Sequence, residues 1–163
     1  MPKIQNVALS DIKKGNHMPV DETAILIQIV DPLMEFPVAK HTFKEVYQFE
    51  FLDLEHYDNF ADDFKISDAQ ASELVDILRK ALLDNSDVVV HCVAGVCRSG
   101  AVCEVGVIMG FDDTYSYRSP NLMVKHKMMK KLGLTYDSDE THTINGIMLD
   151  SGIIVPKNYE GDI

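Results

Sequence analysis

A short run near the middle of the chain restricts the possible folds more than any other stretch. Residues 88–90 are three valines in a row, which is typical of a buried strand. A loop containing Gly95 follows, and the apolar residues 101–109 then predict a buried helix. The backbone N–H groups of such a loop and of the helix N-terminus point at one spot, so this strand–loop–helix unit predicts a site for an anion.

Two side chains give this loop chemical capability. Cys92 lies at the end of the predicted strand, where the local positive potential favours the thiolate, the nucleophilic form of the side chain. Arg98 follows six residues later, and its planar guanidinium suits two oxygens of a phosphate. The alternative interpretation is a buried Cys that acts as a small hydrophobe beside an exposed Arg.

The string His91-Cys92-x-x-Gly95-x-x-Arg98-Ser99 resembles the signature of the protein tyrosine phosphatase superfamily, in its compact dual-specificity branch. The resemblance spans roughly residues 4–133 and is to small microbial and phage phosphatases. It rests on the order of five features, namely a strand at 24–30 with Asp31-Pro32 after it, Phe51-Leu52-Asp53, a helix capped at Ser67, the signature itself, and Pro120-Asn121.

The remaining patterns predict the fold class. Residues 24–30 and 46–52 favour strands, and residues 3–9 favour one more weakly. Ser67 and Gln70 form a capping box before an apolar stripe at helical spacing. A helix that leads into a buried strand, followed by another helix, implies parallel strands with the ligand at their carboxyl ends. We therefore expect an α/β fold: a central, mostly parallel sheet flanked by helices, with the Cys-x5-Arg loop between the central strand and a buried helix.

The last third of the chain carries weaker signals. We expect Pro120 at the first position of a helix that ends at Gly133, with its lysines on a solvated face. Apolar stretches on both sides of residues 150–152 predict a hairpin. The domain prediction is a catalytic domain over residues 1–133 and a C-terminal extension over 134–163, of unknown role and packed on the same domain.

Charge and cysteine usage argue against several classes of partner and ligand. The net charge of −11 should repel nucleic acid and anionic membrane surfaces, so we expect neither as a partner. The three cysteines are crowded at 92, 97 and 103, with neither the pattern of a disulfide framework nor zinc-ligand spacing. The N-terminus lacks the apolar region of a signal peptide. These features predict a cytoplasmic protein with no metal and no cofactor.

The resemblance implies roles for the signature residues. Cys92 would be the nucleophile that forms a phosphocysteine, and His91 would orient the strand end and favour the thiolate. Ser99 would help the sulfur leave in the second step. The phosphate would be bound by the loop and the arginine, that is by Val93, Ala94, Gly95, Val96, Cys97 and Arg98. The loop carries no lysine, unlike the loops of inositide-type relatives.

The general acid that protonates the leaving oxygen is less sharply defined. In the family it precedes the Cys by roughly thirty to forty residues. Asp53 is the preferred candidate because it ends a Phe-x-Asp after the preceding strand, and Asp58 is the runner-up. Asp62 and Asp63 also qualify by distance. For most of the carboxylates between residues 50 and 63, a solvated acidic loop is the simpler interpretation.

The sequence therefore predicts a phosphatase for phosphotyrosine, alone or with phosphoserine and phosphothreonine, in a protein or peptide substrate. A phosphatase for a nucleotide or inositol phosphate is the main alternative, and the residues do not separate the two. A rhodanese-like sulfurtransferase conflicts with the upstream carboxylates, and a binding module without turnover conflicts with the intact Cys92, Arg98 and Ser99. Cys97 either fills space or traps an oxidised Cys92 as a disulfide.

Overall fold

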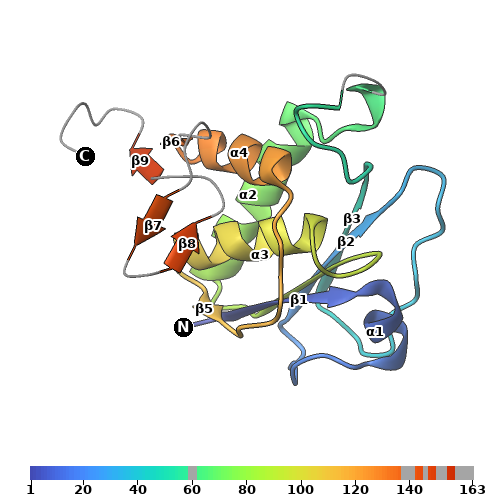
Figure 1. Cartoon of the computed structure of the whole chain (residues 1–163). Helices are drawn as coiled ribbons and strands as arrows, with labels where there is room; N and C mark the ends of the chain where they lie inside the picture. The colour runs from blue at the N-terminus through green and yellow to red at the C-terminus, as the bar shows by residue number, and fades with distance from the viewer. Residues whose placement is uncertain (59–61, 137–141, 145–146, 150–153, 157–163) are drawn as a thin grey trace.

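The computed structural model describes residues 1–58, 62–136, 142–144, 147–149 and 154–156. At its centre is a five-stranded sheet in which every pair of neighbouring strands is parallel. The strand order is β3-β2-β4-β1-β5 (Figure 1). The bounds are β1 Lys3–Ala8, β2 Ile25–Val30, β3 Glu45–Glu50, β4 Val88–Cys92 and β5 Asp112–Asp113. The predicted α/β class and the central position of the strand before the loop are confirmed.

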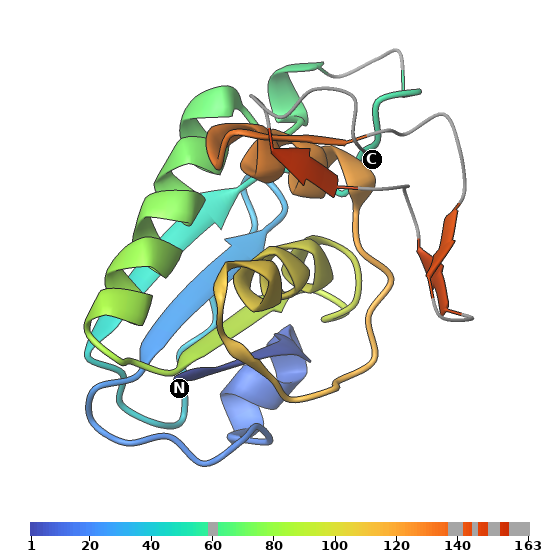
Figure 2. The same ribbon diagram turned by 90° about the vertical axis from the view of Figure 1, so that its left-hand side faces the viewer.

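Helices lie on both sides of this sheet (Figures 1 and 2). On one side, α2 (Asp68–Leu83), α3 (Arg98–Met109) and α4 (Leu122–Lys131) pack with the larger hydrophobic core. On the other side, α1 (Leu9–Lys14) places Ile12 in a smaller core with Leu26 and Val89. β2 and β4 are buried on both faces, which explains why they appear in the sequence as nearly continuous apolar runs.

The predicted start of α2 is confirmed. The capping box of α2 is present, because Gln70 N donates to Ser67 Oγ at 3.0 Å and Ser67 N donates to Gln70 Oε1 at 2.9 Å. The short α1 was not predicted. It has only six residues and one buried side chain, so its sequence contains no recognisable helical periodicity. A 3₁₀ turn, η1 (Asp62–Phe64), precedes α2.

Two predictions for the last third of the chain are wrong. Pro120 is not the first residue of α4, which begins at Leu122 because the side chain of Asn121 caps it by accepting from Val124 N at 3.0 Å. Nor do the lysines of α4 form one solvated face. Lys125 is buried and pairs with Glu104 at 2.6 Å, so its charge is neutralised inside the protein.

The predicted hairpin around residues 150–152 is also wrong. β8 (Ile147–Leu149) pairs with β7 (His142–Ile144), and β9 (Ile154–Pro156) pairs with β6 (Leu134–Tyr136). Residues 150–153 themselves lie outside the described residues. The division of the chain at residue 133 stays a prediction.

The parallel register brings the ends of the central strands to one edge of the sheet. Ala8 at the end of β1 pairs with Cys92, Gln28 of β2 pairs with His91, and Val30 pairs with Glu50. The segments that follow β2, β3 and β4 therefore begin close together, as expected for the ligand-binding edge of an open parallel sheet. Within the described part of the chain, no helix has both the length and the apolar character needed to cross a membrane.

Candidate active site

The loop over residues 93–97 joins the last residue of β4, Cys92, to the first residue of α3, Arg98. The Cys92 side chain is almost completely buried. Its Sγ accepts a hydrogen bond from Gly95 N at 3.2 Å and lies 3.1 Å from Ser99 Oγ. Both groups can donate a hydrogen bond to the sulfur.

Gly95 is required by the close approach of the loop to β1. Its φ is +78°, and a Cβ at this position would lie 2.4 Å from the backbone nitrogen of Ala8. The side-chain amide of Asn6 donates to Gly95 O at 2.8 Å and to Tyr117 O at 2.9 Å. Leu9 N donates to Val93 O at 3.2 Å. The end of β1 and the start of α1 therefore hold the loop in shape, a role that sequence analysis missed for Asn6.

Arg98 is fixed from outside the loop. Its Nη1 donates to Asp31 Oδ1 and to Phe51 O, both at 2.7 Å. Its Nε is buried and has no hydrogen-bond partner among the residues that the structure describes. One amino group of the guanidinium is thus held by protein oxygens, whereas Nε has no such partner among the described residues. Asp31 was not among the predicted site residues.

Asp53 lies three residues after β3 and is tied to the loop through Asn121. Its Oδ1 accepts from Asn121 Nδ2 at 2.7 Å, and Asn121 N donates to Cys97 O at 2.9 Å. The pKa of the Cys97 thiol is raised by burial first and then by the nearby Asp53 carboxylate. Asp53 is exposed, so a substrate can reach it from solvent.

Two of the other three candidate acids have partners outside the loop, and the third is exposed. Asp58 Oδ2 accepts from Glu55 N at 2.8 Å, Asp62 pairs with Lys65 at 3.0 Å, and Asp63 is an exposed residue of η1. In the described part of the chain, no hydrogen bond or ion pair joins any of the three to the loop. Of the four carboxylates, the structure brings Asp53 to the loop.

His91 and Ser99 are both fully buried. His91 Nδ1 lies 3.2 Å from Cys92 O, and because a carbonyl only accepts, this contact places the ring proton on Nδ1. Burial lowers the pKa of His91, which keeps the imidazole neutral. This bond fixes the carbonyl at the end of β4, whereas Ser99 Oγ is the side-chain group beside the sulfur.

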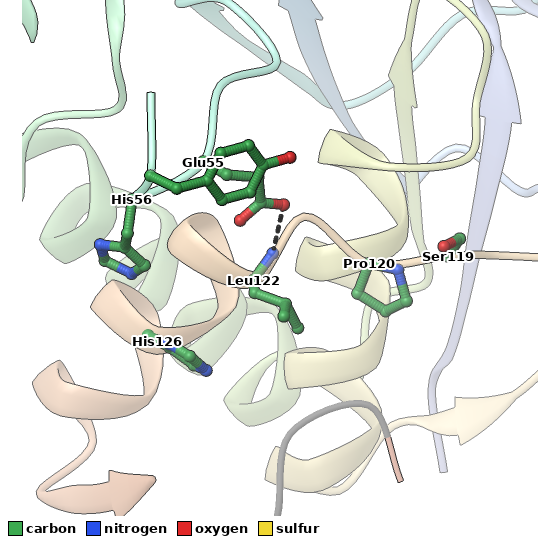
Figure 3. Close-up of a pocket in the computed structure, with 7 residues that line it drawn as sticks. Glu55, His56, Ser119, Pro120, Leu122 and His126 are labelled. Carbon is green, nitrogen blue, oxygen red and sulfur yellow. Dashed lines mark hydrogen bonds between the residues drawn. The ribbon is translucent and has the colours of Figure 1, made fainter. Parts of the chain in front are cut away.

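A pocket of about 480 Å³ lies between the segment after β3 and the start of α4. One wall is formed by Glu55 and His56, and the other by residues at the start of α4 and just before it, namely Ser119, Pro120, Leu122 and His126 (Figure 3). Tyr57 also lines the pocket. The second wall is bonded to the loop, because Ser119 N donates to Val96 O at 3.2 Å. Ser119 therefore lines the pocket and is also bonded to the loop, whereas residues 92–98 themselves are not among the lining residues.

Comparison with known proteins gives a structural likeness without a sequence match. No family model matches the chain, and no curated protein matches it. The human tyrosine phosphatase-like serine/threonine/tyrosine-interacting protein is similar in structure, with a TM-score of 0.53 and 16% identity, over 80% of this chain and 91% of that one. The tyrosine phosphatase OH1 from the Orf virus has a TM-score of 0.45 and 19% identity, over 67% of this chain and 56% of that one. The first likeness confirms the tyrosine-phosphatase type of fold implied by the signature.

Proposed function

We propose that this chain, which has the fold of a tyrosine phosphatase-like protein, hydrolyses phosphate monoesters through a phosphocysteine intermediate. The observation that carries the proposal is the arrangement of Cys92 and Arg98 around one loop. Two donor groups lie within 3.2 Å of the sulfur, and the buried Nε of Arg98 has no partner among the described residues. This arrangement supports a role for Cys92 as the nucleophile and for the loop and Arg98 as the binding site of the phosphate.

In the first step, the Cys92 thiolate attacks phosphorus. The P–S bond forms while the P–O bond of the ester breaks, and the leaving oxygen takes a proton from Asp53. The backbone N–H groups of the loop and the free edge of Arg98 bind the three remaining oxygens as charge moves toward the leaving group. The bond from Asn121 holds the Asp53 carboxylate at the loop for this transfer.

In the second step, water attacks the phosphocysteine. Asp53, now ionised, accepts a proton from that water, the P–S bond breaks, and inorganic phosphate is released. The sulfur leaves as a thiolate next to the Ser99 hydroxyl and the N–H of Gly95. Both groups can donate hydrogen bonds that stabilise the negative charge on the sulfur after the P–S bond breaks.

The test is turnover of p-nitrophenyl phosphate by the wild type, Cys92→Ser and Cys103→Ala. Cys103 is a matched control because it is a buried thiol on α3, away from the loop. We expect loss of turnover in Cys92→Ser, full turnover in Cys103→Ala, and one phosphoryl group on the Cys92 peptide after acid quenching of the wild type. Turnover that survives in Cys92→Ser would overturn the covalent mechanism.

One observation favours a second candidate function, namely binding of a phosphorylated partner without turnover. The structurally similar human protein is described as phosphatase-like and as an interacting protein. A wild type that binds a phosphotyrosine peptide but never releases phosphate would be a binding module that uses the same loop. Calorimetric titration of the wild type with that peptide, beside the turnover assay, separates the two functions.

A further inference from the structure

The pocket at the start of α4 has walls from two distant parts of the chain. Glu55 comes from the segment after β3, and Leu122 comes from the start of α4 (Figure 3). Tyr57, from the same segment as Glu55, also lines the pocket. The segment just before α4, which contributes Ser119 to the pocket, is bonded to the loop, because Ser119 N donates to Val96 O and Asn121 N donates to Cys97 O. A group that flanks a phosphoryl group bound in the loop therefore has the pocket within its reach.

Glu55 occupies the N-terminus of α4. Its two carboxylate oxygens accept from Leu122 N at 3.0 Å and from Met123 N at 3.2 Å. The first N–H groups of a ten-residue helix would otherwise attract an anion such as a phosphate. Because a carboxylate of the protein already takes this position, a second phosphate in the pocket would meet a negative charge and no unused donor at the helix end.

The other lining groups do not reverse this charge. No lysine or arginine is among the described residues that line the pocket. The ring of His126 stacks on that of His56 with centroids 5.5 Å apart. Burial lowers the pKa of His126 to about 4, so this imidazole is neutral at physiological pH.

Tyr57 offers a surface that suits a cation. Its side chain is 78% exposed although it lines the pocket, so the ring can receive a ligand. The face of an aromatic ring attracts a guanidinium or ammonium group, and Glu55 lies on the same wall to add charge attraction. Asp58 lies on the same segment as Glu55 and Tyr57, although it does not line the pocket.

We infer that this pocket is a substrate subsite for a Lys or Arg side chain that flanks the phosphorylated residue, and that Glu55 excludes a second phosphate from it. The inference rests on the proposed phosphatase function and specifies its substrate class. It favours phosphorylated proteins with a basic flank, and it disfavours inositol polyphosphates, nucleoside diphosphates and doubly phosphorylated peptides.

The experiment measures kcat/KM for phosphotyrosine peptides that differ at one flanking position, scanned on both sides of the phosphotyrosine. That position carries Arg, Ala or phosphoserine. We expect the wild type to prefer the Arg peptide to the doubly phosphorylated one by roughly tenfold or more, from one charge contact and one ring contact. Glu55→Gln should reduce this ratio severalfold, chiefly by accepting the doubly phosphorylated peptide.

Two further variants keep the result interpretable. Asp62→Asn removes the same charge from an exposed position on the acidic segment and outside this pocket, so the ratio should not change. Tyr57→Ala leaves the contacts of Glu55 with α4 in place and should lower kcat/KM for the Arg peptide alone. Equal kcat/KM for all three peptides in the wild type, or an unchanged ratio in Glu55→Gln, would overturn the inference.

Failure of the proposed function gives a different result. If p-nitrophenyl phosphate and every peptide stay intact, the phosphatase proposal fails, and calorimetric titration of the wild type with the same peptides decides the subsite. Tighter binding of the Arg peptide than of the doubly phosphorylated one would retain the subsite. Equal binding, or no binding, would reject it as well.

Discussion

Arg98 and Asp31 form an ion pair, with 2.7 Å between Nη1 and Oδ1, although they lie 67 residues apart in the sequence. The Arg98 side chain is 6% exposed, whereas that of Asp31 is 44% exposed and borders solvent. Phe51 O accepts from the same Nη1. The carboxylate therefore has two effects on the arginine: it fixes the orientation of the guanidinium, and it reduces the positive charge offered to a phosphate.

These two effects can be separated by substitution. Asp31→Asn keeps an acceptor for Nη1 but removes the charge, so inorganic phosphate should inhibit it roughly threefold to tenfold more tightly than the wild type. Asp31→Ala removes the acceptor as well, and kcat should fall because the guanidinium is no longer oriented. Inhibition constants and kcat values for both variants test this. If Asn and Ala behave alike, orientation of Arg98 does not depend on Asp31.

Arg98→Lys should be almost as damaging as Arg98→Ala. The ammonium group of a lysine can bind Asp31 and Phe51 O, the two oxygens that already hold Nη1, but it has no second edge for the phosphate. We expect kcat/KM for p-nitrophenyl phosphate to drop by roughly a hundredfold or more in both variants. Recovery of most of kcat/KM by Lys would show that Arg98 supplies charge alone.

Asp53→Asn should separate substrates by their leaving groups. Without the acid, kcat should fall strongly for an alkyl or unactivated aryl phosphate and much less for p-nitrophenyl phosphate, whose leaving group needs little protonation. Asp58→Asn is the matched control from the same segment, and its kcat should stay near the wild-type value for both substrates. The opposite pattern would move the general acid to Asp58.

His126 on α4 should make the stability of the protein depend on pH. Burial lowers the pKa of His126 from 6.5 to about 4. Between these values the unfolded chain binds a proton that the folded protein excludes, so the free energy of unfolding should decrease as pH falls through this window. Urea unfolding at about pH 7 and about pH 5 measures the slope.

Burial also lowers the pKa of His91, which makes stability depend on pH in the same direction. A variant of His126 is therefore needed to isolate the contribution of His126. The slope should be smaller in His126→Gln than in the wild type, and the two proteins should lose different amounts of stability on acidification. Parallel slopes would assign the pH dependence to other groups.

Cys97 should protect Cys92 against irreversible oxidation. Peroxide converts the Cys92 thiolate to a sulfenic acid, and attack by the Cys97 thiolate would then form a disulfide and release hydroxide. Burial raises the pKa of Cys97, so this second reaction should be faster at higher pH. Wild-type activity should return with dithiothreitol, whereas Cys97→Ser should lose activity permanently. Equal recovery of the two proteins, with no disulfide in the loop peptide, would leave Cys97 as a packing residue.

The sequence alone determined the local units of this protein. The strand before the loop, the capping box at Ser67, and the Cys92–Arg98 spacing are signals between neighbouring residues, so they could be predicted without a structure. The resemblance added the tyrosine-phosphatase type of fold, which the structural comparison confirmed. The start of α4 was misplaced because Pro120 and Asn121 both carry helix-start signals, and the side-chain bond to Val124 N decides between them.

Only the tertiary structure decided which distant residues complete the candidate site. Asp31 at the end of β2 reaches Arg98, Asn6 of β1 holds Gly95, and Asn121 holds Asp53. Glu55 likewise meets the N-terminus of α4 from 67 residues away. Each contact depends on the order and register of parallel strands and on the packing of α4 against the loop. A pattern within a few residues carries no information about these, because they arise only when separate segments are buried together.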